Sequence, residues 1–272
     1  MGKLNWLYRQ INLLSLDVTA GVVIGALFFA KIFQVQIRPQ GLITLALTVW
    51  VIYTADHLLD AYKIKNVAST ERHRFHQQNF LWLMIALGSC IAINIILIFF
   101  IKETVLKWGI VLIGIVVVYL FFQKYLLFFK ELIAALLYSG GVVLPSLVVA
   151  SLPIDFFIKA VILQFFITAW FNLVLFSLFD NEKDVRDRHN SFVTTVGATK
   201  TKFILYSIFS FNTSLFILQL VYNSPWVFAI SILMIMNIVL LIILLKQKWF
   251  EVNDRFRLLG DSIFLLPILF LI

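Results

Sequence analysis

Long apolar segments recur along almost the whole chain, and they restrict how it can fold. A helix needs about 20 apolar residues to cross the hydrocarbon core of a membrane. Nine segments reach or approach this length: residues 18–36, 41–59, 80–101, 108–123, 131–151, 157–179, 203–222, 226–245 and 258–272. We therefore expect an all-α polytopic membrane protein, a bundle of about nine transmembrane helices.

The composition leaves no soluble domain to be assigned. Hydrophobic residues make up 62% of the 272 residues and charged residues 13%, against roughly 25% charged residues in ordinary soluble domains. Residues 1–272 are therefore expected to form a single transmembrane domain. Residues 1–17 carry Lys3 and Arg9 but lack an apolar core followed by a cleavage site. We interpret them as a short amphipathic helix at the membrane surface.

Basic residues are unevenly distributed among the connections between these segments. If the N-terminus is cytoplasmic, 17 of the 22 Lys and Arg residues lie in cytoplasmic segments. Cytoplasmic loops of membrane proteins are enriched in Lys and Arg, so this orientation is predicted. It also accounts for the net charge of +8 without a nucleic-acid partner. The compact, loop-poor pattern favours a bacterial inner membrane.

Two groups of aspartates stand where an apolar segment meets a polar loop. Asp56 and Asp60 end the second segment, and Asp180, Asp184 and Asp187 follow the sixth. Spacings of three and four residues place side chains on one face of a helix. Carboxylates gathered in this way repel one another unless they are protonated or hold a cation. If the two helices pack together, the aspartates form a site for a divalent metal with oxygen ligands.

The two aspartate groups have similar surroundings. Asp56 and Asp180 lie 124 residues apart, and each begins an Asp-x-x-x-Asp pair followed by a basic loop and another apolar segment. This repetition indicates a duplicated helical unit, which is a common way to build a membrane bundle around a central site. One pair alone is equally well explained as a solvated helix end. Two matched pairs on the same membrane side favour a shared site.

Basic residues accompany the aspartates in the same loops. They are Arg72, Arg74, Lys124, Lys130, Lys183 and Arg188. Each of them alone is also explained as a positive charge of a cytoplasmic loop. Together, carboxylates that take a metal and cations that take phosphate oxygens are what a magnesium-bridged diphosphate requires. We therefore predict a site for Mg²⁺ and a diphosphate, with these candidates for phosphate binding: Arg72, Lys124, Lys130 and Arg188.

The placement of these motifs resembles that of the UbiA superfamily of intramembrane prenyltransferases. The resemblance covers nearly the whole chain, because that family has nine spans with aspartate motifs after the second and the sixth. Asp180-x-x-x-Asp184, the basic residues after it and the segment 191–197 are similar to the second motif. The first motif departs from the usual Asn-Asp-x-x-Asp-x-x-x-Asp pattern. Ile52 and Tyr53 stand where its leading Asn and Asp would be.

The resemblance implies a reaction and a role for each residue. A polyprenyl group would move from its diphosphate to an aromatic or other lipophilic acceptor within the membrane. Asp56, Asp60, Asp180 and Asp184 would be catalytic and would bind magnesium. Asp187 would be a further metal ligand. Lys124 and Lys130 would face the diphosphate. Phenylalanines such as Phe165, Phe166 and Phe176 would stabilise a developing carbocation.

Three other functions fit some of the same features. Acids in apolar segments and an internal repeat also occur in transporters and ion-coupled carriers. The incomplete first motif leaves a catalytically silent relative as a second alternative. A CDP-alcohol phosphotransferase would also use aspartates and magnesium, but its Asp-Gly-x-x-Ala-Arg sequence is absent. The depth of the acids distinguishes enzyme from carrier, since carriers place binding groups near the middle of the membrane.

Overall fold

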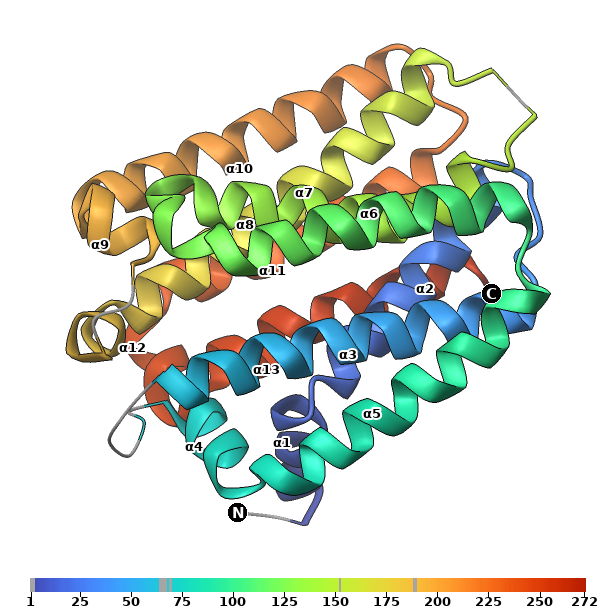
Figure 1. Ribbon diagram of the computed structural model, residues 1–272. Coiled ribbons are helices and arrows are strands. Elements are labelled where there is room, and N and C mark those ends of the chain that lie inside the picture. The colour runs from blue at the N-terminus through green and yellow to red at the C-terminus, as the bar shows by residue number, and fades with distance from the viewer. Residues whose placement is uncertain (1–2, 64–67, 69, 152, 188–189) are drawn as a thin grey trace.

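The computed structural model describes every residue except 1–2, 64–67, 69, 152 and 188–189, and each regular element in the described part is a helix (Figure 1). The long helices are α2 (Leu16–Ile32), α3 (Pro39–Lys63), α5 (Phe80–Leu97), α6 (Glu103–Phe122), α7 (Lys130–Leu147), α8 (Phe156–Asp187), α10 (Ala198–Val221) and α11 (Val227–Leu245). The short ones are α1 (Lys3–Leu13), α4 (Glu71–Gln78), α9 (Phe192–Val196), α12 (Gln247–Glu251) and α13 (Arg255–Ser262). The 3₁₀ helices are η1 (Ile98–Phe100), η2 (Gln123–Tyr125), η3 (Leu127–Phe129), η4 (Val252–Asp254) and η5 (Ile263–Phe270).

Among the described residues, seven helices are long and apolar enough to cross a membrane by themselves: α3, α5, α6, α7, α8, α10 and α11. α1 and α2 pass the same test together, with a bend of 73° between them, and make an eighth candidate span. The bend falls at Ser15, whose φ of 55° is left-handed. Trp50 Nε1 donates a hydrogen bond of 3.0 Å to the carbonyl oxygen of Leu14 beside this bend.

The last apolar segment is a composite of α13 and η5. Eight residues of α-helix followed by eight of 3₁₀-helix extend for about 28 Å, because the rise per residue is about 1.5 Å in the first and about 2.0 Å in the second. That length is close to the roughly 30 Å of a bilayer core. η5 packs against α2 and α11. The predicted all-helical bundle of about nine spans is confirmed.

The helices differ widely in how much of their surface the bundle covers. Of the most apolar stretch of α8, 67% is buried, and the value for α11 is 56%. The corresponding value is 6% for both α5 and α6. α8 is therefore the central helix, in contact with α7, α10 and α11, whereas α5 and α6 lie at the periphery and present most of their side chains to lipid.

Polar side chains join the three helices of the core at mid-span. Thr168 of α8 accepts hydrogen bonds from Asn237 Nδ2 of α11 at 2.6 Å and from Asn212 Nδ2 of α10 at 3.4 Å. One turn earlier, Gln164 Oε1 accepts a bond of 3.3 Å from Gln219 Nε2. All five side chains are fully buried. Hydrogen bonds of this kind hold transmembrane helices in register where hydrophobicity alone does not distinguish one register from another.

Close approach of helices at α2 depends on two glycines four residues apart. A Cβ atom at Gly21 would lie 2.9 Å from Cβ of Phe264 in η5, and one at Gly25 would lie 2.8 Å from Cγ1 of Val142 in α7. Small residues at this spacing let backbones of neighbouring membrane helices approach closely. α2 is thereby fixed between the last span and α7.

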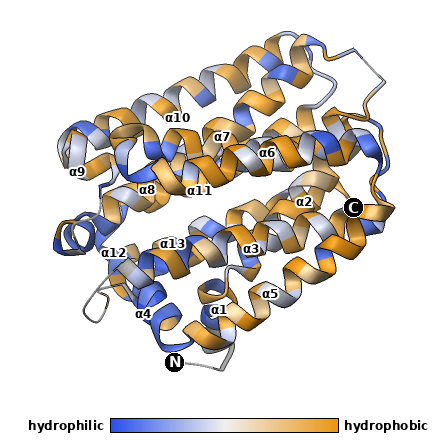
Figure 2. Cartoon of the chain, viewed as in Figure 1, coloured by the Kyte–Doolittle hydropathy of each residue, from blue (hydrophilic) through white to orange (hydrophobic). Residues whose placement is uncertain are grey.

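The short helices gather at one end of the bundle. α4 connects α3 to α5, α9 connects α8 to α10, and α12 connects α11 to α13. Figure 2 shows hydrophilic residues concentrated around α4 and α12, next to long helices coloured mostly as hydrophobic. This end is called the polar end below.

We predict that Gly21→Ala destabilises the protein by about 1–2 kcal/mol. The new methyl group would meet Phe264, and overpacking a membrane interface of this kind costs about 1–3 kcal/mol, partly offset by the better helix propensity of alanine. Thermal unfolding in detergent measures the effect. Gly114→Ala is the matched control, because a Cβ there meets nothing within 4 Å. Equal stability of the two variants would contradict the packing role of Gly21.

Candidate functional site

A cavity of about 830 Å³ reaches the polar end and is lined mainly by α3, α6, α7 and α8, with residues from α2 and α5 as well. Most of its wall is apolar. The charged residues that line it at the polar end are Asp56, Asp60, Arg72, Lys130, Glu131, Asp180, Asp184, Arg257 and Asp261. The helix ends that carry the two predicted aspartate pairs therefore meet at one cavity.

Asp56 and Asp60 lie one turn apart on the cavity face of α3. The Asp60 side chain is buried, with an exposed fraction of 8%, and Asp56 is half-buried. Gln123, the first residue of η2, donates a hydrogen bond of 2.8 Å from Nε2 to Oδ1 of Asp56. This bond joins the end of α3 to the end of α6 across the cavity.

Asp180 and Asp184 lie one turn apart near the end of α8, and both line the same cavity. Asp180 is buried and forms an ion pair with Arg257 of α13. Its Oδ1 atom lies 3.6 Å from Nζ of Lys183, which is closer to Asp254 at 2.8 Å. The negative charge of Asp180 is therefore compensated by two cations, mainly by Arg257 and less by Lys183.

The four aspartates do not form a ready-made metal cluster. Among the described residues, no three His, Cys, Asp or Glu side chains are placed so that they could hold a metal ion together. Asp187 is the last residue of α8. The Asp187 side chain and Arg188 lie outside the part of the chain that the structure describes.

The predicted basic residues fall into two groups. Arg72 and Lys130 line the cavity. Lys124 is absent from the lining, and its Nζ lies 4.7 Å from the centroid of the neighbouring Tyr125 ring. It touches the site only through its backbone, where its carbonyl oxygen accepts a bond of 3.2 Å from Asn190 Nδ2.

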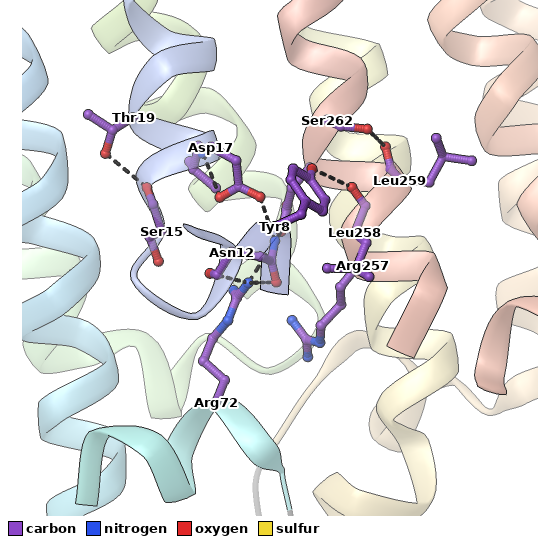
Figure 3. Close-up of polar contacts among 12 residues, drawn as sticks. Tyr8, Asn12, Ser15, Asp17, Thr19, Arg72, Arg257, Leu258, Leu259 and Ser262 are labelled. Carbon is purple, nitrogen blue, oxygen red and sulfur yellow. Dashed lines mark hydrogen bonds and ion pairs between the residues drawn. The ribbon is translucent and has the colours of Figure 1, made fainter. Parts of the chain in front are cut away.

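Arg72 is held in a buried polar cluster that joins both ends of the chain (Figure 3). Its Nη2 atom donates to Oδ1 of Asn12 at 2.9 Å and lies 3.3 Å from Oδ2 of Asp261. Asn12 Nδ2 in turn donates to Asp261 at 2.9 Å and to Asp17 at 2.6 Å. Figure 3 shows Arg72 reaching from α4 toward Asn12, with Arg257 beside it on α13. We name Asn12, Asp17, Arg72 and Asp261 the N-terminal cluster.

α13 brings two charged residues to the site that the sequence reasoning missed. Arg257 and Asp261 are one turn apart, so one faces Asp180 and the other faces Arg72. Gly260 lets this helix lie close to α8, because it has no side chain. A Cβ at this position would be 2.5 Å from Phe176 and 2.7 Å from Oδ1 of Asn172. Asp261 could have been identified from the sequence, because it lies inside the apolar segment 258–272 and a charged residue in such a segment indicates a functional site.

The segment after α8 covers the cavity and is fastened by two buried side chains. Glu131 of α7 accepts a hydrogen bond of 2.7 Å from the backbone N–H of Phe192, and Ser177 of α8 accepts one of 2.9 Å from that of Val193. Ser191, which caps α9, lines the cavity. These bonds position the predicted segment 191–197 over the second aspartate pair.

Several aromatic and polar side chains line the cavity below the charges. Of the three phenylalanines expected to face a carbocation, Phe176 lines the cavity, whereas Phe165 and Phe166 do not. Tyr53 and Tyr138 line it as well. Tyr53 therefore occupies the cavity wall at the position where the usual first motif has its leading Asp.

Asn172 also lines the cavity, and its buried Oδ1 atom has no hydrogen-bond partner. It lies two turns before Asp180 on α8. Because an unpaired acceptor is costly in an apolar bundle, this oxygen is a candidate contact for a bound molecule.

The sequence matches no protein-family model and no curated protein, whereas the structure has clear counterparts. A UbiA homologue from Archaeoglobus fulgidus, solved bound to DMAPP and Mg²⁺, matches with a TM-score of 0.65 and 12% identity, over 95% of this chain and 97% of that one. The apo structure of a UbiA homologue from Aeropyrum pernix K1 matches with a TM-score of 0.65 and 13% identity, over 94% and 97%. The chain has the fold of these UbiA homologues, as the sequence resemblance implied.

We predict that His76 of α4 makes the fold less stable as the pH falls. Burial lowers the pKa of this imidazole below 6.5, and the nearby Arg72 guanidinium acts in the same direction, while a hydrogen bond to the Arg72 carbonyl oxygen opposes them. The unfolded chain then binds more protons at this residue below pH 6.5, so the free energy of unfolding falls with pH.

Unfolding temperatures at pH 7.5 and pH 5.5 test this prediction. The difference between the two should be smaller in His76→Gln than in the wild-type protein. An equal difference in both would show that His76 carries none of the pH dependence.

Proposed function

We propose that the protein is a magnesium-dependent intramembrane prenyltransferase that moves a polyprenyl group from its diphosphate to an aromatic or other lipophilic acceptor. One observation carries the proposal: Asp-x-x-x-Asp pairs from two separate helices meet at the polar end of a cavity whose remaining wall is apolar. Such a cavity suits a molecule with a charged head and a hydrocarbon tail. Support comes from the A. fulgidus homologue of the same fold, which binds DMAPP, an allylic diphosphate, and Mg²⁺.

The residues at the polar end suit magnesium. Mg²⁺ prefers oxygen ligands and is usually bound through one or two carboxylates together with substrate phosphates, so it needs no cluster of three acids. Asp56 and Asp60 from α3, and Asp180 and Asp184 from α8, would hold it, with Asp187 as a further candidate. Oδ1 of Asp180 is buried without a hydrogen bond, which leaves an acceptor oxygen at the site. When bound, the ion would stabilise negative charge on the departing diphosphate.

Three basic side chains of the cavity would bind the diphosphate. Arg257, Lys130 and Arg72 line its polar end. Arginine donates paired hydrogen bonds to phosphate oxygens, and a partly buried guanidinium does so in a low dielectric. Arg257 already faces the second aspartate pair through its ion pair with Asp180. We assign it the main anion-binding role.

Rings and the cover over the cavity would protect the reacting carbon. As the bond between the prenyl carbon and the diphosphate oxygen breaks, positive charge develops on the allylic carbon. Phe176, Tyr53 and Tyr138 line the wall there, and a ring face stabilises a cation by about 0.5–2 kcal/mol. The segment fastened by Glu131 and Ser177 lies at the polar end of the cavity, where it would limit the access of water. The acceptor then supplies the electron pair of the new bond.

The position of the acids supports an enzyme over a carrier. Asp60 lies one turn before the end of α3, and Asp184 lies one turn before the end of α8. Carrier sites lie near the middle of the membrane, where unwound helices contribute ligands. A catalytically silent relative remains the second candidate, because Ile52 and Tyr53 give the cavity wall no carboxylate where the usual first motif has one.

Charge distribution supports an orientation for this site. The polar end carries the basic loops that the positive-inside rule assigns to the cytoplasm. We propose that the polar end and the N-terminus face the cytoplasm of a bacterial inner membrane, where a diphosphate product would leave into water.

Asp60→Asn and Asp184→Asn are each expected to abolish the release of diphosphate from an allylic polyprenyl diphosphate, with little change in expression. Each substitution keeps the shape of the side chain and removes the negative charge that binds the metal. Release of labelled diphosphate, with and without Mg²⁺, is the measurement. Glu182→Gln is the matched control on α8, because Glu182 is exposed and does not line the cavity. Normal release by either aspartate variant would remove the metal assignment.

Arg257→Gln is expected to weaken binding of the allylic diphosphate about tenfold or more, because charge-assisted bonds to phosphate oxygens are lost. Arg257→Lys should fall between this variant and wild type. Arg255→Gln is the control on the same helix, since Arg255 lies over the exposed Trp249 ring, 4.4 Å from its centroid. Equal affinity in Arg257→Gln and Arg255→Gln would show that Arg257 only neutralises Asp180.

A further inference from the structure

The cavity continues far beyond the charged residues, along the whole cavity face of α3. Its lining residues there include Asp60, Asp56, Ile52, Thr48, Leu45 and Gly41, which recur every three or four residues. This spacing keeps them on one face of the helix. Nineteen residues separate the first from the last, which corresponds to about 28 Å of helix. The cavity is therefore a groove that traverses most of the membrane.

α6 forms the opposite wall over the same distance. Gln123 lies at the polar end, Val116 and Gly109 line the middle, and Lys102 lines the far end. α3 and α6 are both weakly covered by other helices, with 11% and 6% of their apolar stretches buried. Between its two ends the groove is lined mostly by apolar residues, with Thr44, Thr48 and Asn94 as polar ones, and Lys102 and Arg38 lie at its far end.

Glycines keep the lower part of the groove wide. Gly41, Gly109 and Gly141 all line it. A Cβ at Gly109 would meet nothing within 4 Å, and one at Gly141 would meet only Leu112 at 3.9 Å. Neither glycine is needed for close packing between helices, so both are open positions in the groove wall.

We propose that this groove binds the tail of a long-chain polyprenyl diphosphate of about four to five isoprenoid units. This inference rests on the proposed function and specifies the length of the prenyl donor's tail. Each isoprenoid unit adds four main-chain bonds of about 1.5 Å and extends for about 5 Å. The diphosphate takes the level of Asp60 and Asp56, so the part of α3 from Asp56 to Gly41 leaves about 22 Å for the tail, enough for about four to five units. A tail of three units would end about two thirds of the way along.

The groove is assigned to the donor because it is continuous with the site of its head group. Asp56 and Gln123 stand at the top of the two walls and are joined by a hydrogen bond of 2.8 Å. The apolar wall begins directly below them. A tail attached to a diphosphate at this point enters the groove without crossing another charged residue until Arg38 and Lys102 at the far end.

Gly109→Phe tests the assignment, because it places a ring in the groove about 21 Å from Gln123, at the level of about the fourth unit. Binding of farnesyl, geranylgeranyl and hexaprenyl diphosphate is measured with wild type and variant in nanodiscs. We expect hexaprenyl diphosphate to bind about tenfold more weakly to the variant, and farnesyl diphosphate to bind equally to both. Gly141→Phe on α7 should have the same effect and provides a second variant if the first does not fold.

Gly114→Phe is the matched control, since Gly114 lies on the same helix, does not line the cavity and has nothing within 4 Å of a Cβ. It should bind all three diphosphates as wild type does. If hexaprenyl diphosphate binds equally to wild type, Gly109→Phe and Gly141→Phe, or if all three chain lengths weaken together, the tail lies elsewhere and the proposed function stands. If no allylic diphosphate binds to the wild type, both proposals fail.

Discussion

Charge compensation between buried carboxylates and two arginines organises the polar end of this bundle. Asp180 pairs with Arg257, and Asp261 pairs with Arg72. Removing either partner of a buried ion pair is strongly destabilising, because it leaves a charge without compensation in a low dielectric. Since Arg257 and Asp261 share one face of α13, that short helix joins α8 to α4. The walls of the cavity are therefore positioned by the same charges that would bind the substrate.

On the proposed function, these pairs also set a condition for binding. Asp180 would have to exchange part of its contact with Arg257 for a metal ion, and the arginine would turn to the phosphate oxygens. Both charges would then be compensated by the substrate complex instead of by each other. Arg72 is held differently, because Asn12 and Asp261 both contact it. It would act with its position already fixed by the N-terminal cluster, while Arg257 would reorient.

The sequence predicted the helical bundle, because segment length and composition depend only on local residues. It predicted that the two aspartate pairs would share a site from their matched surroundings and from the family resemblance, and both pairs line one cavity. The sequence did not show that the side chain of Gln123, and not that of the neighbouring Lys124, faces the cavity. Adjacent residues of a 3₁₀-helix point about 120° apart, and only the packing of η2 shows that Gln123 faces the cavity. Arg257 and Asp261 were missed because their partners are distant in the sequence. The last span was predicted at residues 258–272 although that segment is short, and the structure explains the short length, since a 3₁₀-helix covers the same depth with fewer residues.

The two aspartate-bearing helices sit in very different surroundings, and this has a consequence for how the site assembles. α8 is the most buried span and is held to α10 and α11 by the hydrogen bonds of Thr168 and Gln164, whereas only 11% of the apolar stretch of α3 is covered. Asp180 and Asp184 stand on the more buried helix of the two, so any change in the distance between the pairs on binding would come from α3.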